Sequence, residues 1–419
     1  MTNDNLPVSG TPEKPVKKPK KSHSKMISNI IFLIAMTILM LTLFLSLGEL
    51  EQIGETIKEI GQNNNYVWLI VALLLAVVYF ILWPISLALF AKASKCESTF
   101  GDSFLIGSIE HFYNGITPFS VGGQPFQIYN YTKRGVSSDK ATGVILANFV
   151  TFMLATNTIA FISLFFWDDF TGRLANIGGQ DLSWFKGIAI AGFVINFLVL
   201  LFMIALGTSK TVRKIIYWLF DLVCRPKWLG KHLRKFQPAL ESYVHNAQVS
   251  FKQIMIHKGT FVLAFIVRFV TMCVFYTIPF FIMKAVGIQV GWEELHLILF
   301  GTAFAITSVV FVPTPGGTGG IEYAFAIVIA AIGATAFGKT QAVALMWRLI
   351  TYYFLMIVSF IFSAILEGKI SFRLKKIDDK KNQEALEVEA ASEVLSNEEP
   401  LETTTTNNEE IAKDDTNNE

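Results

Sequence analysis

Apolar segments of about 20 residues recur along this chain, and that is the length a helix needs to cross the hydrocarbon core of a bilayer. Hydrophobic residues make up 52% of the chain and charged residues only 16%, whereas a soluble domain carries about 25% charged residues. The composition therefore excludes an ordinary soluble domain and predicts an all-α, polytopic membrane protein. Six full crossings are expected, at 26–47, 67–91, 141–167, 185–206, 259–284 and 341–367.

Two further apolar stretches, 104–131 and 296–337, are interrupted by Gly and Pro. Each contains the motif T-P-x-x-x-G-G, as TPFSVGG at 117–123 and TPGGTGG at 314–320. Pro removes a backbone donor and clashes with the preceding turn, while Gly permits sharp turns and a close approach to a ligand. Such backbone is tolerated at membrane depth only where protein covers it or where it lines a cavity. We therefore expect two re-entrant, broken hairpins.

The positions of Lys and Arg predict the orientation, because these residues concentrate in cytoplasmic loops. The cluster at 17–21 and the basic residues at 133–140 lie inside, and the loop 48–66, with four Glu against Lys58, lies outside. Both termini are then cytoplasmic, and the two broken stretches enter from opposite sides. The motif Thr follows the start of the preceding crossing by 50 residues in one case and 55 in the other. This arrangement is an inverted-topology repeat, typical of secondary transporters.

Three polar segments flank or interrupt the expected transmembrane domain, 26–370. The basic tail 1–25 and the acidic tail 371–419 have few apolar residues, so we expect both to be disordered in the cytoplasm. The segment 208–258 carries ten Lys or Arg against two acidic residues and contains Trp218 and Trp228. Two interpretations stay open for it: an amphipathic element on the inner leaflet, or ordinary enrichment of positive charge on the cytoplasmic side.

The two motifs are the first candidates for a binding site. A half-helix that begins just after Gly-Gly would aim free N–H groups and a positive dipole end at a central cavity, and such an end favours anions, above all phosphate. Two of these ends facing each other would suit a lipid headgroup. The alternative is a pair of tight turns without a ligand. Thr117, Gly122, Gly123, Thr314, Gly319 and Gly320 are the motif residues concerned.

Ionisable residues inside apolar segments are costly and therefore mark candidate sites. Alternatives remain for most of them. His111 is otherwise a hydrogen-bonded core residue, Glu322 a cap of its own helix, and Arg348 a structural partner. Arg268 is too deep to reach the interface easily, so we expect a buried partner or a ligand. Tyr129 and Arg134 either meet an entering phosphate or anchor the hairpin. The candidates are Glu110, His111, Asn114, Tyr129, Arg134, Arg268, Glu322 and Arg348.

Other chemistry is not indicated. Cys96, Cys224 and Cys273 are far apart and have no metal-ligand spacing, so we interpret them as small apolar side chains and predict no metal, cofactor or catalytic residue. The sequence has no match to G-x-x-x-x-G-K-[ST], so no ATP-driven step is suggested.

The run from Asn114 through TPFSVGG to Arg134, followed by PTPGG at 313–317 and Glu322, resembles the transmembrane region of lysylphosphatidylglycerol synthase. This is the flippase-like membrane family related to multiple peptide resistance factor, and the resemblance covers roughly residues 26–370. It implies binding and translocation of a phospholipid or lipid-linked headgroup in a bacterial-type plasma membrane. Glu110, Asn114, Arg134, Glu322 and Arg348 are the positions that would carry this role.

Full-length members of that family join the membrane part to a cytoplasmic domain that transfers an aminoacyl group from tRNA to phosphatidylglycerol. Here a low-complexity tail of about 50 residues, acidic in net charge, follows the last crossing; it is too short for such a domain and would repel nucleic acid. We therefore expect a lipid flippase or transporter. The alternatives are a phosphatidylglycerol lysyltransferase and a membrane scaffold for a separate transferase. Both a homo-oligomer and a separate transferase partner stay open. The sequence does not specify the lipid, the direction or the energy coupling.

Overall fold

The computed structural model describes residues 65–117, 122–166, 183–226, 233–309, 319–333 and 337–369, and positions 54, 57, 58, 60–62, 120 and 317. All regular elements in these ranges are helices, which confirms the predicted all-α class. The chain divides into two compact units, Met1–Ser363 and Ala364–Glu419. Every contact that follows lies within the first unit.

Five helices in the described ranges are long and apolar enough to cross a membrane. They coincide with five of the six predicted crossings, and the sixth, 26–47, lies outside the described residues. Their outward faces expose large apolar side chains, such as Leu74, Leu198 and Phe202, as expected for surfaces that contact lipid chains. The five are Tyr66–Ala93, Ser138–Phe166, Gly187–Thr208, Lys258–Ala285 and Lys339–Lys369.

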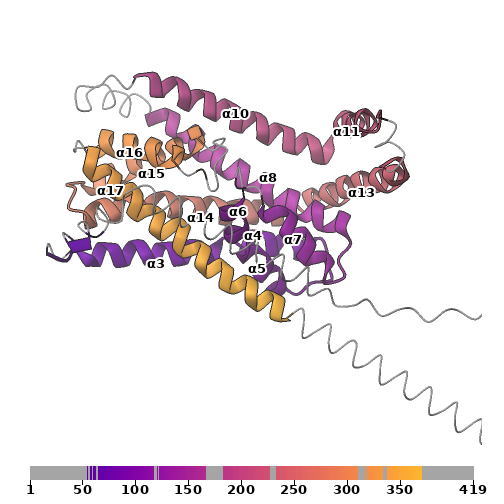
Figure 1. Cartoon of the computed structure of the whole chain (residues 1–419), viewed down its shortest axis with the longest axis horizontal. Coiled ribbons are helices and arrows are strands. Elements are labelled where there is room, and N and C mark those ends of the chain that lie inside the picture. The colour runs from indigo at the N-terminus through magenta and orange to yellow at the C-terminus, as the bar shows by residue number, and fades with distance from the viewer. Residues whose placement is uncertain are drawn as a thin grey trace, which may run out of the picture. The chain divides into compact units, whose positions relative to one another are not determined.

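The first of these spans is built from α3 (Tyr66–Leu82) and α4 (Ile85–Ala93), which meet at Pro84. The others are α8 (Ser138–Ser163) with the short η1 (Leu164–Phe166), α10 (Ser183–Thr208) and α14 (Lys258–Ala285). α14 packs against α3, α4, α8 and α15 and so forms the centre of the unit. Figure 1 shows α14 lying between α3 and α8.

The last span contains a local change of helix type. α17 (Phe337–Arg348) continues into η4 (Leu349–Phe354), which is a π-helix. Single π-helical turns inside α-helices are rare and occur frequently at functional sites. The π-turn begins directly after Arg348, one of the candidate site residues.

Both broken stretches are interrupted at their motifs. The first forms α5 (Phe100–Ser108), α6 (Glu110–Ile116) and α7 (Gly123–Thr132). The second forms η3 (Trp292–Glu294), α15 (Leu295–Val309) and α16 (Gly320–Gly333). Since α6 ends just before Thr117 and both α7 and α16 begin at a motif glycine, the Pro and Gly residues end and restart the helices as predicted. Their re-entry into the bilayer stays a prediction.

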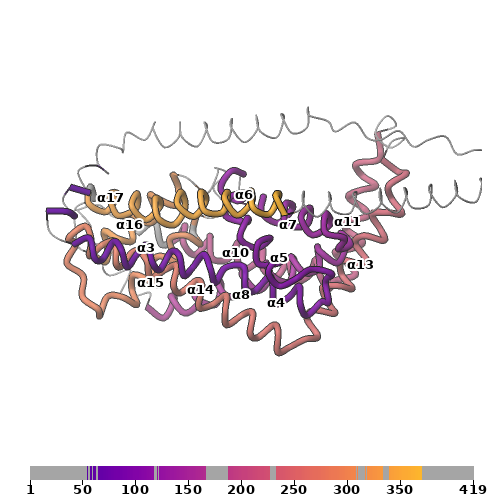
Figure 2. Tube along the Cα trace, turned by 90° about the horizontal axis from the view of Figure 1, so that it is seen from below, coloured from indigo at the N-terminus to yellow at the C-terminus, as the bar shows by residue number. Residues whose placement is uncertain are grey.

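The basic segment forms α11 (Lys210–Val223), η2 (Arg234–Phe236) and α13 (Gln237–Ile256). α13 lies closely against two spans, because Gly143 of α8 is next to Ser250 and Gly207 of α10 is next to Phe251. α11 is seen nearly end-on in Figure 1, where α10 lies lengthwise in the plane of the picture, whereas Figure 2 shows α11 from the side.

Candidate functional site

A cavity of about 240 Å³ lies between the two interrupted hairpins. Both hairpins and the last span contribute to its lining, together with the spans that contain α3, α8, α10 and α14. Of the predicted site residues, His111, Asn114 and Arg348 line this space, whereas the motif residues Thr117, Gly122, Gly123, Gly319 and Gly320 do not. Its lining residues are Tyr79, Trp83, His111, Asn114, Gly115, Ser120, Phe152, Met153, Thr156, Asn196, Met272, Phe275, Tyr276, Ile306, Thr307, Ile321, Trp347, Arg348, Thr351 and Tyr352.

The turn of the first motif is held by its own side chains. Thr117 Oγ1 donates to the Tyr113 carbonyl oxygen at 2.8 Å and accepts from the Gly122 N–H at 2.9 Å. Asn114 Oδ1 accepts from the Gly123 N–H at 2.8 Å. These two glycine N–H groups at the start of α7 are thus occupied. Our expectation that they are free for an anion was wrong, because Asn and Thr side chains cap helix starts readily.

The same turn leaves no room for a side chain on its glycines. A Cβ on Gly122 would lie 2.4 Å from Thr117 Cγ2 and 2.7 Å from the Tyr113 carbonyl oxygen. A Cβ on Gly123 would lie 2.5 Å from Glu110 Cγ. The glycines of this motif are therefore required by close packing at the helix start.

We expect Gly122→Ala to destabilise the protein by about 1–3 kcal/mol, the usual cost of overpacking a filled site. The alanine methyl group would displace Thr117 or the backbone at Tyr113 and open the turn. Gly101→Ala is the matched control, because a Cβ there meets nothing nearer than 4.0 Å in the same hairpin. Thermal unfolding followed by size-exclusion chromatography in detergent should show a lower Tm for the Gly122 variant alone. Equal Tm values for the two variants would contradict this account.

The second motif ends in a turn that requires glycine and is capped by Glu322. Gly317 and Gly319 have φ values of +68° and +90°, which favour glycine. Glu322 Oε2 accepts from the Gly319 N–H at 2.7 Å, so Glu322 caps its own helix, as the alternative to a binding role foresaw. Glu322 Oε1 also accepts from Arg348 Nε at 2.6 Å, so the residue is a partner of Arg348 as well. Thr314 lies outside the described residues.

The last span links the two hairpins through the end of α17 and the π-turn that follows it. Arg348 pairs with Glu322 of the second hairpin, and its guanidinium lies 4.4 Å from the centre of the Tyr352 ring. Tyr352 donates its hydroxyl hydrogen to the Gly115 carbonyl oxygen of the first hairpin at 2.8 Å. A shift of this segment would therefore move contacts on both sides of the cavity. Tyr352 was not predicted as a site residue, since nothing in the neighbouring sequence distinguishes a tyrosine in an apolar segment from one that packs against lipid.

Trp83 contacts two buried ionisable residues, Glu110 at its indole N–H and Arg268 at its ring face. The Glu110 side chain, in a residue only 5% exposed, accepts from Trp83 Nε1 at 2.9 Å and from the Gln127 and Gln124 amides at 3.1 and 3.2 Å. Arg268 is 1% exposed, and its guanidinium lies 4.1 Å from the centre of the Trp83 ring. Neither residue lines the cavity itself, but Trp83 does.

Arg268 has the buried partners that its depth predicted. Its Nη2 donates to Ser86 Oγ at 2.5 Å and to Asn148 Oδ1 at 2.9 Å. Nε and Nη1 have no hydrogen-bond partner among the described residues. The guanidinium thus ties α14 to α4 and α8 and stacks on the aromatic wall of the cavity.

His111 lines the cavity within a group of aromatic rings. Its ring centre lies 4.7 Å from that of Trp83 and 5.3 Å from that of Tyr79. Its Nε2 is buried without a hydrogen-bond partner in the described part of the chain, so this nitrogen does not show the hydrogen bond of a satisfied core histidine.

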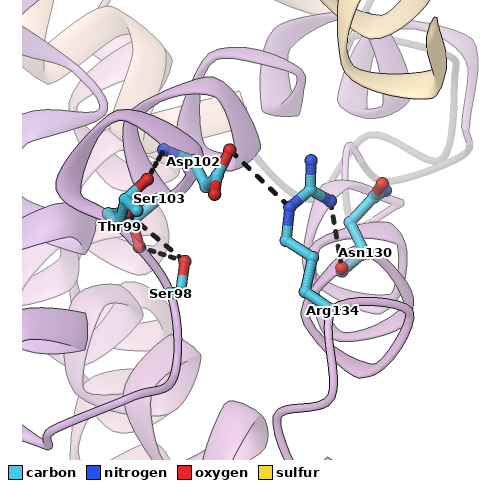
Figure 3. A network of polar contacts seen from close by, with 6 residues as sticks. All are labelled: Ser98, Thr99, Asp102, Ser103, Asn130 and Arg134. Atoms are coloured by element: carbon cyan, nitrogen blue, oxygen red, sulfur yellow. Dashed lines mark hydrogen bonds and ion pairs between the residues drawn. The ribbon is translucent and has the colours of Figure 1, made fainter. Parts of the chain in front are cut away.

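Tyr129 and Arg134 are not brought to the cavity. Arg134 is buried, with Nε 3.9 Å from Asp102 Oδ1 and Nη1 donating to the Asn130 carbonyl oxygen at 3.3 Å. Figure 3 shows this contact joining the end of α7 to α5. Tyr129 is exposed, with Lys133 Nζ 4.5 Å from its ring centre. The contacts of Arg134 match the anchoring interpretation of the hairpin end.

The three cysteines are unpaired thiols. Cys96, outside the spans, contacts Ser94 Oγ at 3.0 Å, and burial raises the pKa of its thiol above the ordinary value. Cys96 is therefore protonated at neutral pH.

Comparison of the sequence with known proteins places this chain in a family. The family model for the lysylphosphatidylglycerol synthase TM region matches residues 25–359. A UPF0104 membrane protein of Archaeoglobus fulgidus is 25% identical over 329 residues, 77% of this chain and 91% of its own length. The uncharacterized protein MG306 of Mycoplasma genitalium is 21% identical over 325 residues, 75% of this chain and 81% of its own. No solved structure matches.

Proposed function

Because the chain belongs to the family of the lysylphosphatidylglycerol synthase transmembrane region, we propose that it is a lipid flippase. It binds the phosphate-bearing headgroup of a phospholipid or lipid-linked molecule between its two interrupted hairpins, while the acyl chains stay in the bilayer. The observation that carries the proposal is the shared cavity, which both hairpins and the π-turn line. Loop charges support a plasma-membrane orientation with both termini in the cytoplasm.

The lining of the cavity suits an amphiphilic headgroup. Ligand sites are mostly apolar with a few convergent polar groups, and aromatic side chains form much of this wall. Asn114, Ser120, Thr307 and Thr351 supply amide and hydroxyl groups, and Arg348 supplies the cation. Hydrogen bonds between a guanidinium and a phosphate are charge-assisted and about twice as strong as neutral ones. A phosphate in the cavity would compete with the Glu322 carboxylate for Arg348.

Competition between the lipid phosphate and Glu322 for Arg348 would couple headgroup binding to movement of the hairpins. Glu322 holds both Arg348 and the Gly319 N–H at the start of α16. When a phosphate takes the guanidinium, the tie between α16 and the last span is released. The two hairpins could then rock relative to each other, as inverted repeats do in alternating access.

Reconstituted vesicles test the proposal directly. We expect the protein to accelerate exchange of a fluorescent phosphatidylglycerol between leaflets, measured by dithionite quenching. Thr156→Trp should reduce the rate several-fold, because Thr156 lines the cavity and the added indole would fill it. Leu198→Trp is the control, since Leu198 is 56% exposed on the lipid-facing side of α10.

Two outcomes would oppose the proposal. Equal exchange rates in protein-free and wild-type vesicles would exclude flippase activity toward this lipid. Equal rates for wild type and the monodisperse Thr156 variant would place the lipid path outside the cavity. The enzymatic alternative has a separate readout: aminoacylated phosphatidylglycerol in extracts of cells that produce the protein would support a lysyltransferase.

A further inference from the structure

α11 carries a continuous apolar stripe that no described residue covers. Its five members are between 39% and 56% exposed, and Trp218, the most exposed, is at its middle. At 3.6 residues per turn, positions spaced by three, four, seven and eight fall on one helix face. The stripe consists of Ile215, Trp218, Leu219, Leu222 and Val223.

The opposite face of α11 is the one that contacts the protein. Arg213 Nη1 lies 2.7 Å from His245 Nδ1, and Tyr217 donates its hydroxyl hydrogen to the Glu241 carbonyl oxygen at 3.1 Å. Both partners belong to α13. The polar face is therefore fixed on α13, and the apolar stripe points away from it.

The start of α11 is fixed at the end of a membrane span. Thr208 ends the span Gly187–Thr208, and Ser209 caps α11 by accepting from the Thr211 N–H at 3.1 Å. Gln248 of α13 holds this corner by donating to the carbonyl oxygens of Leu206 and Ser209 at 2.8 and 3.2 Å. α11 then runs across the direction of α10 (Figures 1 and 2), so it would lie along the plane of a membrane that α10 crosses.

Basic residues accompany the stripe. Lys210, Arg213, Lys214 and Arg225 stand against the single acid Asp221 in and just after α11. A helix with a Trp-containing apolar face and a Lys/Arg-rich polar face is the pattern of interfacial helices. Each basic residue near an anionic leaflet contributes about 1 kcal/mol of attraction.

We propose that α11 is a binding surface for the anionic phospholipids of the cytoplasmic leaflet. The stripe enters the boundary between headgroups and acyl chains, and Lys210 and Lys214 contact lipid phosphates. This inference is independent of the flippase proposal.

Fluorescence quenching by chain-brominated lipids tests the surface in full-length protein reconstituted into nanodiscs. The difference between wild type and Trp218→Phe isolates the Trp218 emission from the other tryptophans. We expect this emission to be quenched, and more strongly in discs containing phosphatidylglycerol than in discs of phosphatidylcholine. The double variant Lys210→Gln/Lys214→Gln should lose that preference for phosphatidylglycerol.

A charge-matched control distinguishes an effect of the α11 lysines from an effect of the protein's overall positive charge. Lys252→Gln/Lys258→Gln removes two exposed lysines outside α11 and should keep the preference for phosphatidylglycerol. Unquenched Trp218 emission in both lipids would overturn the proposal. So would cross-linking of Leu219→Cys to a second copy, which would make the stripe a protein interface. Equal quenching in the two lipids would overturn the assignment to anionic lipid.

Discussion

Arg348→Gln is expected to reduce lipid exchange about tenfold to a hundredfold, because a hydrogen bond to a charged partner contributes about 1.5–3 kcal/mol and about 1.4 kcal/mol corresponds to a factor of ten. Arg348 is the only Lys or Arg among the described residues that line the cavity. Glutamine keeps the size of the side chain roughly but removes the charge that would bind a phosphate. Dithionite-based exchange rates in vesicles, normalised to reconstituted protein, provide the measurement.

A charge reversal distinguishes a substrate contact from a structural ion pair. In Glu322→Arg/Arg348→Glu the pair between α16 and the last span can form again with opposite polarity. If the pair only fastens the helices, exchange should recover with the Tm. If Arg348 binds the phosphate, the Tm recovers at least in part but exchange does not. Full recovery of exchange in the reversed variant would contradict our assignment of Arg348.

Glu322→Gln provides a second control. Its amide oxygen can still accept from the Gly319 N–H, so the start of α16 stays capped, while Arg348 loses its charged partner. On the competition scheme, headgroup affinity should rise in this variant, because the phosphate no longer displaces a carboxylate. An unchanged affinity would argue against competition between Glu322 and the lipid.

The sequence predicted the spans and the breaks well, because both depend on local properties. Apolar runs of sufficient length fix the crossings, and the five that lie in the described ranges coincide with helices. The Pro and Gly residues predicted the positions where α6 ends and where α7 and α16 begin. Glu322 and Arg348 were found as candidates because ionisable residues are rare in apolar segments.

The hydrogen-bond partners that lie far apart along the chain could not be predicted from the sequence. Arg268 bonds to Ser86 and Asn148, which are 182 and 120 positions away along the chain. A small polar residue in an apolar segment carries no local sign that it will bond to a distant arginine. The occupied N–H groups of Gly122 and Gly123 were missed for a different reason. Thr117 and Asn114 were considered as ligands of a lipid, although their short polar side chains also suit local capping.

Arg268→Met is expected to give the largest loss of stability, about 3–5 kcal/mol, because Arg268 is 1% exposed and donates two hydrogen bonds, and each hydrogen bond from a charged group contributes about 1.5–3 kcal/mol. The change leaves the Glu110 carboxylate buried with only neutral donors from Trp83, Gln124 and Gln127. It also removes the donor shared by Ser86 and Asn148. Reversible denaturation in mixed micelles, or the Tm where unfolding is irreversible, measures the effect.

Three further variants test whether Glu110 is the reason. Lys258→Met is the matched control, because it removes an exposed cation at the start of the same helix and should change stability little. Arg268→Lys keeps the charge but lacks the planar guanidinium, which stacks on Trp83 and also donates to two acceptors. We therefore expect an intermediate loss of stability. In Arg268→Met/Glu110→Gln both charges are absent, and the loss should be smaller than the sum of the single losses. Additive losses would show that the two buried charges act independently, and that the Trp83 ring separates them without coupling them.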